Sequence, residues 1–317
     1  MEKRKQLLID RTANFWGLGS DYAAELLRLK PNKSIRLNIN RNINHTLSQL
    51  EALNIQLKPI EWASNCFWSD NSSKLVHHPV FENSDVVIQN ASSFCPVINL
   101  DVETGDKILD LCAAPGLKTS HISDVCGNNA EIIANEYSSV RFKKMEQFFS
   151  GYKCNINCLK SDGRNFSNNP DYLGYFDRVL VDAPCSGEAN INIDDNNSLK
   201  SWSIKNIKRL QSLQLGLLKT AYKLVKNKGV IIYSTCTINA DENEVVISKF
   251  INSNSCYLEK VSTGNLPTVM LNNDSLKRQI ENDILKICAR IMPSQYNEAF
   301  FVAKIVKTKE DEFYFQK

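Results

Sequence analysis

The stretch KILDLCAAPGLKT, residues 107–119, decides the fold of this chain. Its first half is a short apolar run typical of a buried strand, and its second half passes through Ala-Ala-Pro-Gly into a segment compatible with a helix. Small residues let the backbone of such a turn approach a ligand closely, and Gly116 can adopt torsion angles that other residues resist. In open α/β sheets, ligands bind beyond the carboxyl ends of the strands. The stretch therefore predicts a strand, a ligand-binding turn and a helix, in that order.

Strand-like and helix-like segments alternate along the chain after this stretch. Short apolar runs predict strands at residues 107–112, 131–135, 177–182 and 229–233. Helix-compatible segments follow them at residues 118–125, 139–149, 203–226 and 241–251. Parallel strands need crossovers of a dozen or more residues, and these separations provide them. We therefore predict an α/β domain with a mainly parallel sheet and an antiparallel last strand at residues 299–306.

The segment before residue 95 lacks this alternation. It contains Trp62, Phe67 and Trp68 among hydrophilic turns, without the rhythm of βαβ units. We predict a small N-terminal α+β domain at residues 1–95, followed by the larger α/β domain at residues 96–317.

The composition is that of an ordinary soluble protein, with 43% hydrophobic and 23% charged residues in a chain of 317. No run approaches the ~20 continuous apolar residues of a membrane span, and the first ten residues lack the apolar stretch of a signal peptide. Ten cysteines without a secretory signal favour reduced thiols over disulfides. We therefore expect a cytoplasmic protein without a membrane-spanning segment.

Basic residues gather in two stretches. Residues 1–50 hold nine Lys or Arg against four Asp or Glu, and residues 196–240 hold eight Lys or Arg and no acid. Such stretches can bind a phosphate backbone, but they are equally typical of solvated helix faces whose charge is balanced by acidic residues elsewhere in the chain. The net charge of +3 is too small to decide between these interpretations.

Glu136 ends the second predicted strand, 20 residues after Gly116. This is the distance at which an acid meets ribose hydroxyls in nucleoside-binding sheets, so a nucleoside cofactor is indicated. A dinucleotide is disfavoured, because the G-x-G-x-x-G fingerprint is missing. An acid in this place is also commonly the cap of the next helix, and that alternative stays open.

Two cysteines follow neighbouring predicted strands on the ligand side of the sheet. Cys185 lies in the stretch DAPCS from Asp182, and Cys236 lies in the stretch YSTCT from Tyr233. An isolated cysteine is usually a small buried hydrophobe. Two cysteines at adjacent strand ends favour a chemical role instead.

Methylation at carbon 5 of a pyrimidine is the chemistry that needs such a pair. That carbon is a poor nucleophile until a group adds at carbon 6, and a thiolate adds there as a soft nucleophile. Asp182 can stabilise the charge that develops on the ring nitrogens, and a second thiol can assist release. The Asp/Asn-Pro-Pro-aromatic turn that is typical of enzymes that methylate exocyclic amines is absent at this strand end, because Pro184 is followed by Cys185. No zinc site is expected, since no second Cys/His pair accompanies Cys154 and Cys158.

These residues carry a recognisable signature. The stretches QNASS from Gln89, LDLCAAPGLKT from Leu109, ANEYSSVR from Ala134, SDGR from Ser161, DRVLVDAPCSGE from Asp177 and YSTCTINADENEVVI from Tyr233 resemble the Sun-domain family of RNA cytosine-C5 methyltransferases. Three further stretches, SIRLNINR from Ser34, PIEWASNCFW from Pro59 and PSQYNEAFFVAKI from Pro293, resemble the bacterial small-subunit ribosomal RNA methyltransferase F group within that family. The resemblance implies a Rossmann-like class I methyltransferase fold with S-adenosylmethionine as cofactor.

The resemblance also implies a role for individual residues. The cofactor's methionine and ribose would contact the turn that consists of Cys112, Ala113, Ala114, Pro115, Gly116, Leu117 and Lys118. Glu136 would bind the ribose hydroxyls, Asp162 would meet the adenine, and Asp182 would lie between the cofactor and the target base. Cys236 is implied as the nucleophile and Cys185 as the thiol that helps the product leave.

The implied substrate is RNA, with ribosomal RNA expected and transfer RNA as the alternative, and a monomer is expected. Ala189–Asn192 depart from the family pattern after Glu188, and Leu117 stands where many relatives have Gly or Ser. The chain ends at Lys317, so we expect substrate choice to rest on residues 1–95 and the catalytic face. A catalytically silent RNA-binding ribosome assembly factor with the same fold is the rival hypothesis.

Overall fold

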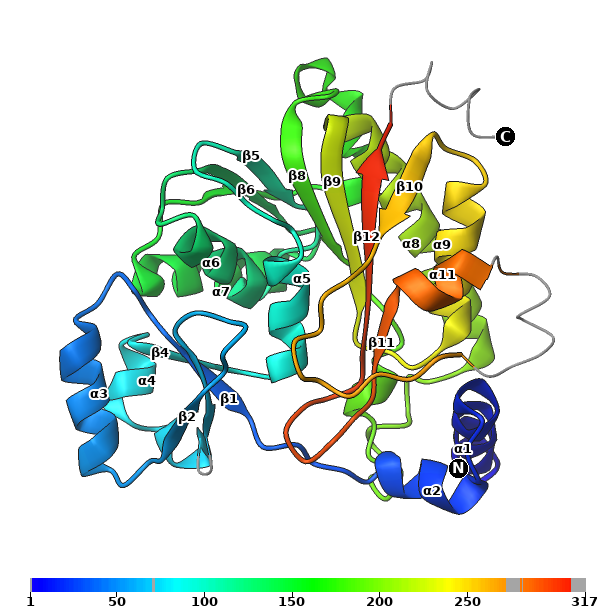
Figure 1. The fold of residues 1–317 in the computed structure, drawn as a ribbon, viewed down its shortest axis with the longest axis horizontal. Helices are drawn as coiled ribbons and strands as arrows, with labels where there is room; N and C mark the ends of the chain where they lie inside the picture. The colour runs from blue at the N-terminus through cyan, green and yellow to red at the C-terminus, as the bar shows by residue number, and fades with distance from the viewer. Residues whose placement is uncertain (1, 70–71, 272–279, 281, 309–317) are drawn as a thin grey trace.

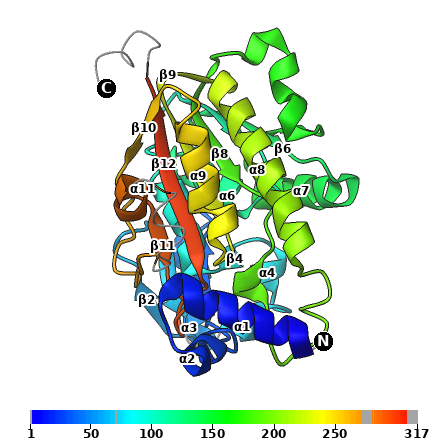
Figure 2. The ribbon, with the colours of Figure 1, turned by 90° about the vertical axis from the view of Figure 1, so that its right-hand side faces the viewer.

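The computed structural model describes residues 2–69, 72–271, 280 and 282–308, and Figures 1 and 2 show its ribbon in two views. A large sheet has the strand order β10-β12-β9-β8-β5-β6-β7, and β11 pairs with β12. Its strands are β5 (Lys107–Asp110), β6 (Glu131–Asn135), β7 (Asn157–Leu159), β8 (Phe176–Asp182), β9 (Val225–Thr235), β10 (Cys256–Glu259), β11 (Ala289–Ile291) and β12 (Phe300–Lys307). Strands β5 to β9 pair in parallel, whereas β12 is antiparallel to its three partners. The predicted α/β class, with its mainly parallel sheet and antiparallel last strand, is confirmed.

Helices cover both faces of the large sheet (Figure 2). They are α5 (Cys95–Ile98), α6 (Leu117–Val125), α7 (Ser139–Tyr152), α8 (Ile204–Leu224), α9 (Glu244–Ile251) and α11 (Asn282–Ile287). Val179 and Val181 of β8 pack in one core with α8 and α9, and Leu180 packs in the other with α5 and α6. Successive side chains of a strand point to opposite faces, so a strand that is apolar throughout needs a helical layer on each side.

Several boundaries differ from those predicted. The short strands β7, β10 and β11 were not predicted, because three or four residues with mixed polarity carry no periodic signal. The helix predicted at residues 241–251 is divided into the 3₁₀ turn η6 (Ala240–Glu242) and α9, with Asn243 between them at φ −114° and ψ −100°. The other 3₁₀ turns are η1 (Ser72–Leu75), η2 (Ala91–Phe94), η3 (Gly163–Asn168), η4 (Pro170–Tyr172) and η5 (Glu188–Asn190).

A second sheet of four antiparallel strands has a core of its own. Its order is β2-β3-β1-β4, with β1 (Ser34–Leu37), β2 (Leu57–Pro59), β3 (Cys66–Ser69) and β4 (Val86–Gln89). Helices α3 (Ile43–Ala52) and α4 (Pro79–Glu82) pack on it around Ile35, Leu50 and Val80. This unit of helices and antiparallel strands, residues 34–89, is called the small domain here.

Helices α1 (Glu2–Trp16) and α2 (Ser20–Leu26) lie on the other side of the molecule from that sheet (Figure 1). Leu8, Trp16 and Ala23 belong to the same core as the strands and helices of the large sheet. Hydrophobic packing thus joins the first two helices to the α/β domain. The division of the chain at residue 95 stays a prediction.

Most of the basic residues among the first 50 are paired. Six of the nine make ion pairs: Lys5 and Arg28 with Asp194, Arg11 with Asp241, Lys33 with Glu298, Arg36 with Asp124 and Arg41 with Asp85. This supports the balanced-charge interpretation for most of that stretch. On α8, in contrast, Lys205, Lys208 and Lys219 are exposed and make no ion pair within the described residues.

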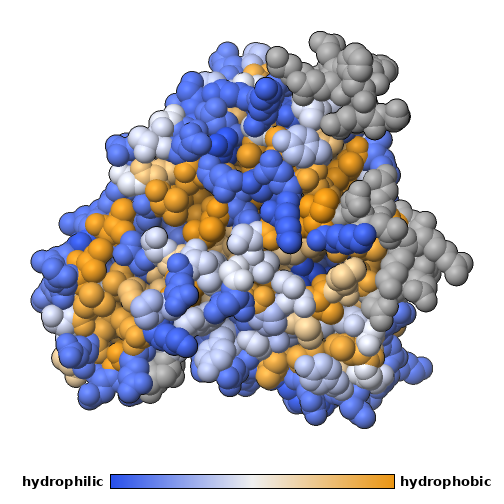
Figure 3. All heavy atoms as spheres, viewed as in Figure 1, coloured by the Kyte–Doolittle hydropathy of each residue, from blue (hydrophilic) through white to orange (hydrophobic). Residues whose placement is uncertain are grey.

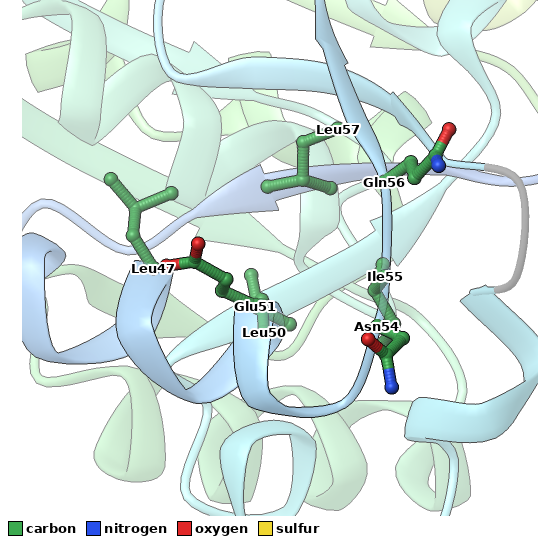
Figure 4. A pocket seen from close by; sticks show the side chains of 7 residues that line it. All are labelled: Leu47, Leu50, Glu51, Asn54, Ile55, Gln56 and Leu57. Atoms are coloured by element: carbon green, nitrogen blue, oxygen red, sulfur yellow. The ribbon is translucent and has the colours of Figure 1, made fainter.

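An apolar hollow of about 400 Å³ opens on the small domain, where Figure 3 shows hydrophobic residues at the surface. Figure 4 shows Leu47, Leu50 and Glu51 of α3 facing the segment of residues 54–57. Helix α3, which lines the hollow, lies at the left of Figure 1, away from the lower ends of β8 and β9. Within the described ranges, no helix combines the length and apolar character needed to cross a bilayer.

Candidate active site

The chain winds to one side of the sheet from β5 and to the other side from β8, and the carboxyl edge between these two strands is called the β5–β8 crevice here. The chain passes from β5 to β6 and β7 on one side, and then through β8 to β9 on the other. This crevice is a topological switch point, where open α/β sheets bind their ligands. In Figure 1, β8 and β9 end at the lower edge of the sheet, between the small domain and α1.

Asp182 and Lys118 meet across this crevice. Lys118 Nζ donates a hydrogen bond of 2.8 Å to Asp182 Oδ2, and Ser234 Oγ of β9 lies 2.7 Å from Asp182 Oδ1. Burial alone would lower the pKa of Lys118, but the carboxylate of Asp182 raises it above its ordinary value. The ammonium also lies 5.3 Å from the centroid of the Phe300 ring. The site therefore holds a fixed cation beside Asp182.

Cys185 and Cys236 meet a little further along the same edge. Asp182 is in register with Ser234, so the residues that follow β8 and β9 emerge side by side. The two Sγ atoms are 3.4 Å apart. The hydrogen bond to Cys236, together with burial, raises the pKa of Cys185 well above its ordinary value. Cys185 is therefore held as a protonated thiol at neutral pH.

A buried carboxyl group fixes the loop that carries Cys185. Glu242 Oε2 accepts hydrogen bonds of 2.9 Å from the Ser186 backbone N–H and from Gln214 Nε2. Gln214 also donates to the Pro184 carbonyl over 2.9 Å. Glu242 Oε1 has no partner among the described residues, and burial raises the pKa of this carboxyl from 4.5 to about 7.

The raised pKa of Glu242 predicts a pH-dependent loss of stability. The folded state binds the proton of Glu242 more tightly than the unfolded state does. The neutral carboxyl therefore contributes fully to the free energy of unfolding below pH 4.5, and this contribution is lost as pH rises to about 7. In a Glu242→Gln variant this loss is absent. Relative to the parent, the free energy of unfolding of the variant should rise by roughly 2–3 kcal/mol between about pH 5 and about pH 8. Urea titrations of both proteins over this pH range measure the difference in free energy of unfolding. A difference that does not change with pH would contradict the raised pKa of Glu242.

Glu188 holds the other side of the same loop. Its carboxylate is buried and accepts hydrogen bonds from Trp202 Nε1 at 2.7 Å, Thr237 Oγ1 at 2.9 Å and Asn239 Nδ2 at 3.1 Å. Immediately after it, the Ala189 N–H donates to the Cys236 carbonyl over 3.2 Å. The segment that departs from the family pattern is thus part of the framework that joins the two cysteine loops.

The turn after β5 adopts the conformation that its glycine allows. Gly116 has φ 105°, and a Cβ atom there would lie 2.7 Å from Cε1 of Phe149 on α7. Asp110, at the end of β5, accepts a hydrogen bond of 2.7 Å from Thr119 Oγ1 of α6. Burial raises the pKa of Asp110 to about 7 and keeps Cys112 a neutral thiol by raising its pKa well above the ordinary value. The turn from Cys112 to Lys118 therefore faces the β5–β8 crevice in a fixed shape.

Glu136 and Asp162 stand at the carboxyl ends of β6 and β7, on the same edge as this turn. Glu136 accepts a 2.7 Å hydrogen bond from the Ser138 N–H and lies 3.3 Å from Arg141, which also donates to the Ala114 carbonyl. The cap of α7 is Ser138, whose Oγ accepts from the Arg141 N–H, so Glu136 supports the start of the helix without capping it. Asp162 caps η3 and binds the Arg164 guanidinium at 2.6 Å, a hydrogen bond that lowers the pKa of Asp162. Ligand roles for both residues stay predictions.

The structure brings together residues that the sequence separates widely. Of the predicted site residues, Asp182, Cys185, Cys236 and Lys118 share one crevice, and Glu136 and Asp162 lie further along the edge. Sequence reasoning missed Gln214, which lies in a segment predicted only as a helix, and Glu242, which lies in a stretch that resembles the family but was given no role. Within the described part of the chain, no three His, Cys, Asp or Glu side chains form a group that could hold a metal ion.

Comparisons with solved structures agree with the fold. A methyltransferase homologue from Pyrococcus horikoshii matches with a TM-score of 0.78 and 25% identity, over 96% of this chain and 97% of that one. The NSun6 protein of the same organism, crystallised with SFG, matches with a TM-score of 0.78 and 18% identity, over 96% of this chain and 98% of that one. The second likeness concerns the fold alone.

Comparisons with sequences identify the family. Ribosomal RNA small subunit methyltransferase F from Vibrio campbellii is 32% identical over 292 residues, which cover 87% of this chain and 57% of the relative. The protein of the same name from Aeromonas hydrophila is 33% identical over 231 residues, which cover 69% of this chain and 47% of the relative. The chain thus spans about half the length of the relatives it matches. The family model for 16S rRNA methyltransferase RsmB/F matches residues 97–306, which include both cysteine loops and the turn after β5, so this chain belongs to the RsmB/F family.

Proposed function

We propose that this chain is an S-adenosylmethionine-dependent methyltransferase that acts on carbon 5 of a cytosine in RNA, with small-subunit ribosomal RNA as its substrate. The observation that carries the proposal is the pair of thiols 3.4 Å apart at the ends of neighbouring strands. The ion pair that joins Asp182, three residues before Cys185, to Lys118 of the turn after β5 adds to it. Family membership supports the choice of ribosomal RNA.

The residues around the crevice fit S-adenosylmethionine by their chemistry. Asp182, Glu136 and Asp162 present carboxylates at successive strand ends, and carboxylates accept hydrogen bonds from hydroxyl and amine groups. The turn from Cys112 to Lys118 offers backbone groups between small side chains. We assign the methionine and ribose to this turn, the ribose hydroxyls to Glu136 and the adenine to Asp162. When bound, the cofactor supplies an electrophilic methyl group.

Cys236 is assigned as the nucleophile. Its thiolate forms a bond to carbon 6 of the cytosine, and the electron pair displaced from the ring double bond makes carbon 5 nucleophilic. Lys118 lies near enough for its charge to interact with a thiolate at Cys236. Asp182 is assigned to the ring nitrogens, where charge accumulates. The target base must leave its stack to reach these groups.

Cys185 is assigned to product release. After methyl transfer, carbon 5 loses its proton to water, the electron pair of that C–H bond re-forms the ring double bond, and the bond between carbon 6 and the Cys236 sulfur breaks with its electron pair on sulfur. Cys185 keeps its proton at neutral pH and lies 3.4 Å from the departing sulfur. It can therefore donate a hydrogen bond to the thiolate as it leaves.

One structural feature favours catalysis over the silent assembly factor. The departure from the family pattern at residues 189–192 motivates the silent alternative. In the structure, however, Glu188 and Ala189 tie this segment to Thr237 and to the Cys236 carbonyl. The altered loop therefore supports the thiol pair instead of obstructing it.

The substrate is tested by comparing a deletion strain with its parent. We expect one cytosine of small-subunit ribosomal RNA to resist bisulfite conversion in the parent, to convert in the deletion strain, and to resist again when the gene is restored. A lost modification in transfer RNA would overturn the choice of substrate. If no cytosine changes and calorimetry detects no binding of S-adenosylmethionine to the purified protein, the silent alternative replaces the proposed function.

A further inference from the structure

A hollow of about 230 Å³ lies where the small domain meets the loops beside the large sheet. Lys58 and Trp68 line it from the small sheet, and Asn265, Pro267 and Tyr296 line it from the loops that flank β11. The rings of Trp68 and Tyr296 lie with centroids 5.6 Å apart, inclined by 59°. Tyr296 is 47% exposed, although a large aromatic residue gains from burial. The hollow thus presents aromatic surface to solvent.

Rigid elements hold both rings. Trp68 stands on β3 directly opposite Lys58 on β2. The loop of Tyr296 is closed by Asn297, which is buried, accepts from Ser294 Oγ over 2.5 Å and donates to the Met292 carbonyl over 2.6 Å. The positions of the two rings are therefore built into the fold.

The wall opposite Tyr296 is fixed as well. Trp62 Nε1 donates a 3.1 Å hydrogen bond to Asn265 Oδ1. Gly264 allows this approach, because a Cβ atom there would lie 2.2 Å from the Trp62 ring. The Lys58 ammonium, in contrast, has no recorded partner within the described part of the chain.

The hollow lies on the same side of the large sheet as the two thiols. Tyr296 precedes β12, whose first residue, Phe300, has its ring 5.3 Å from Lys118 Nζ. The next residue, Phe301, pairs with Thr235, the neighbour of Cys236. Trp68 and Cys236 also pack against one hydrophobic cluster. The hollow is therefore placed at the edge of the large sheet where β9 ends and Cys236 follows.

We propose that this hollow binds one unpaired nucleotide of the RNA that carries the target cytosine. The base stacks on the exposed ring of Tyr296 and contacts Trp68, whose ring is inclined to it, and Lys58 pairs with a phosphate group. The volume is below the roughly 300–1,000 Å³ of pockets for drug-sized ligands, which suits a single base. Stacking on aromatic rings tolerates any base, so the site selects single-stranded RNA and not a sequence. This inference rests on the proposed function, and it adds a second base-binding position outside the catalytic crevice.

The test measures binding of a fluorescent oligouridine of about ten nucleotides, a length typical of single-strand sites. Oligouridine has no target cytosine, and Cys236→Ala protein excludes covalent capture. In that background, Tyr296→Ala should raise the dissociation constant roughly 5- to 150-fold, the effect of one lost stacking contact. Trp68→Phe, which keeps a ring, should change it little. The matched control is Tyr22→Ala on α2, because Tyr22 is 48% exposed and its ring contacts no other aromatic ring within the described residues.

Salt dependence separates the role of Lys58 from that of the rings. Lys58→Ala should reduce the slope of log affinity against log salt by about 0.7, the value for one phosphate contact with a single strand. Tyr296→Ala should leave this slope unchanged. With Cys236 intact, Tyr296→Ala should raise the KM for ribosomal RNA with little change in kcat, and thermal melting verifies that each variant is folded.

The outcomes distinguish this site from the proposed function. If the Cys236→Ala protein does not bind oligouridine, or if Tyr296→Ala binds as tightly as Tyr22→Ala, the nucleotide site is overturned, whatever the enzyme methylates. If binding depends on Tyr296 but the native chain methylates no RNA, the proposed function fails and the nucleotide site stands.

Discussion

Replacing Cys236 by alanine should abolish methyl transfer, whereas replacing Cys185 by alanine should trap the protein on its RNA. Without the Cys236 sulfur, nothing adds to carbon 6 and carbon 5 stays unreactive. We therefore expect the rate of methyl transfer to fall on the order of 10⁴-fold or more. Without the Cys185 thiol, the bond from Cys236 to the base still forms but breaks slowly. The two sulfur atoms lie 3.4 Å apart, yet their removal should have opposite effects on the covalent intermediate.

Two measurements check this asymmetry. Transfer of a radiolabelled methyl group to small-subunit ribosomal RNA reports activity, and denaturing gel electrophoresis reports a protein–RNA adduct. The control is Cys154→Ala, because Cys154 is partly buried outside the crevice and should affect neither measurement. An adduct with Cys236→Ala in place of Cys185→Ala would reverse the two roles. Full activity in both variants would exclude covalent catalysis by either thiol.

Replacing Arg36 by methionine should destabilise the fold strongly. Arg36 of β1 is fully buried, forms an ion pair with Asp124 of α6, and donates to Tyr152 of α7. It also donates to Ser120 Oγ over 2.7 Å and to the Leu117 carbonyl over 3.2 Å. Removal of one partner leaves a buried charge uncompensated, so the free energy of unfolding should fall by about 3–5 kcal/mol.

Urea denaturation measures this effect against a matched control. Arg28→Met removes an ion pair with Asp194 in which both side chains are exposed, so it should change the free energy of unfolding by less than about 1 kcal/mol. The double variant Arg36→Met/Asp124→Leu should recover much of the loss, because it leaves no unpaired charge. Equal effects of Arg36→Met and Arg28→Met would show that the buried pair does not couple the small domain to α6.

The succession of strands along the chain and the principal site residues can be predicted from local sequence patterns. Apolar runs of five or six residues are separated by crossovers, so β5, β6, β8 and β9 can be predicted as parallel strands. The carboxyl ends of parallel strands share one edge, and this alone places Asp182, Cys185 and Cys236 together. The identity of the residues then indicates the chemistry, because thiols at that edge suit addition to a pyrimidine.

Other features depend on contacts between residues far apart in the chain, which leave no local pattern. Arg36 and Asp124 are 88 positions apart, and Gln214 and Glu242 are 28 apart on different elements. The rings of Trp68 and Tyr296 meet only because the small sheet packs beside the loop before β12. Helices α1 and α2 precede the small domain but pack on the large sheet, since their apolar faces are buried there. Local periodicity specifies which side chains of an element are apolar, but only tertiary packing selects the surface that buries them.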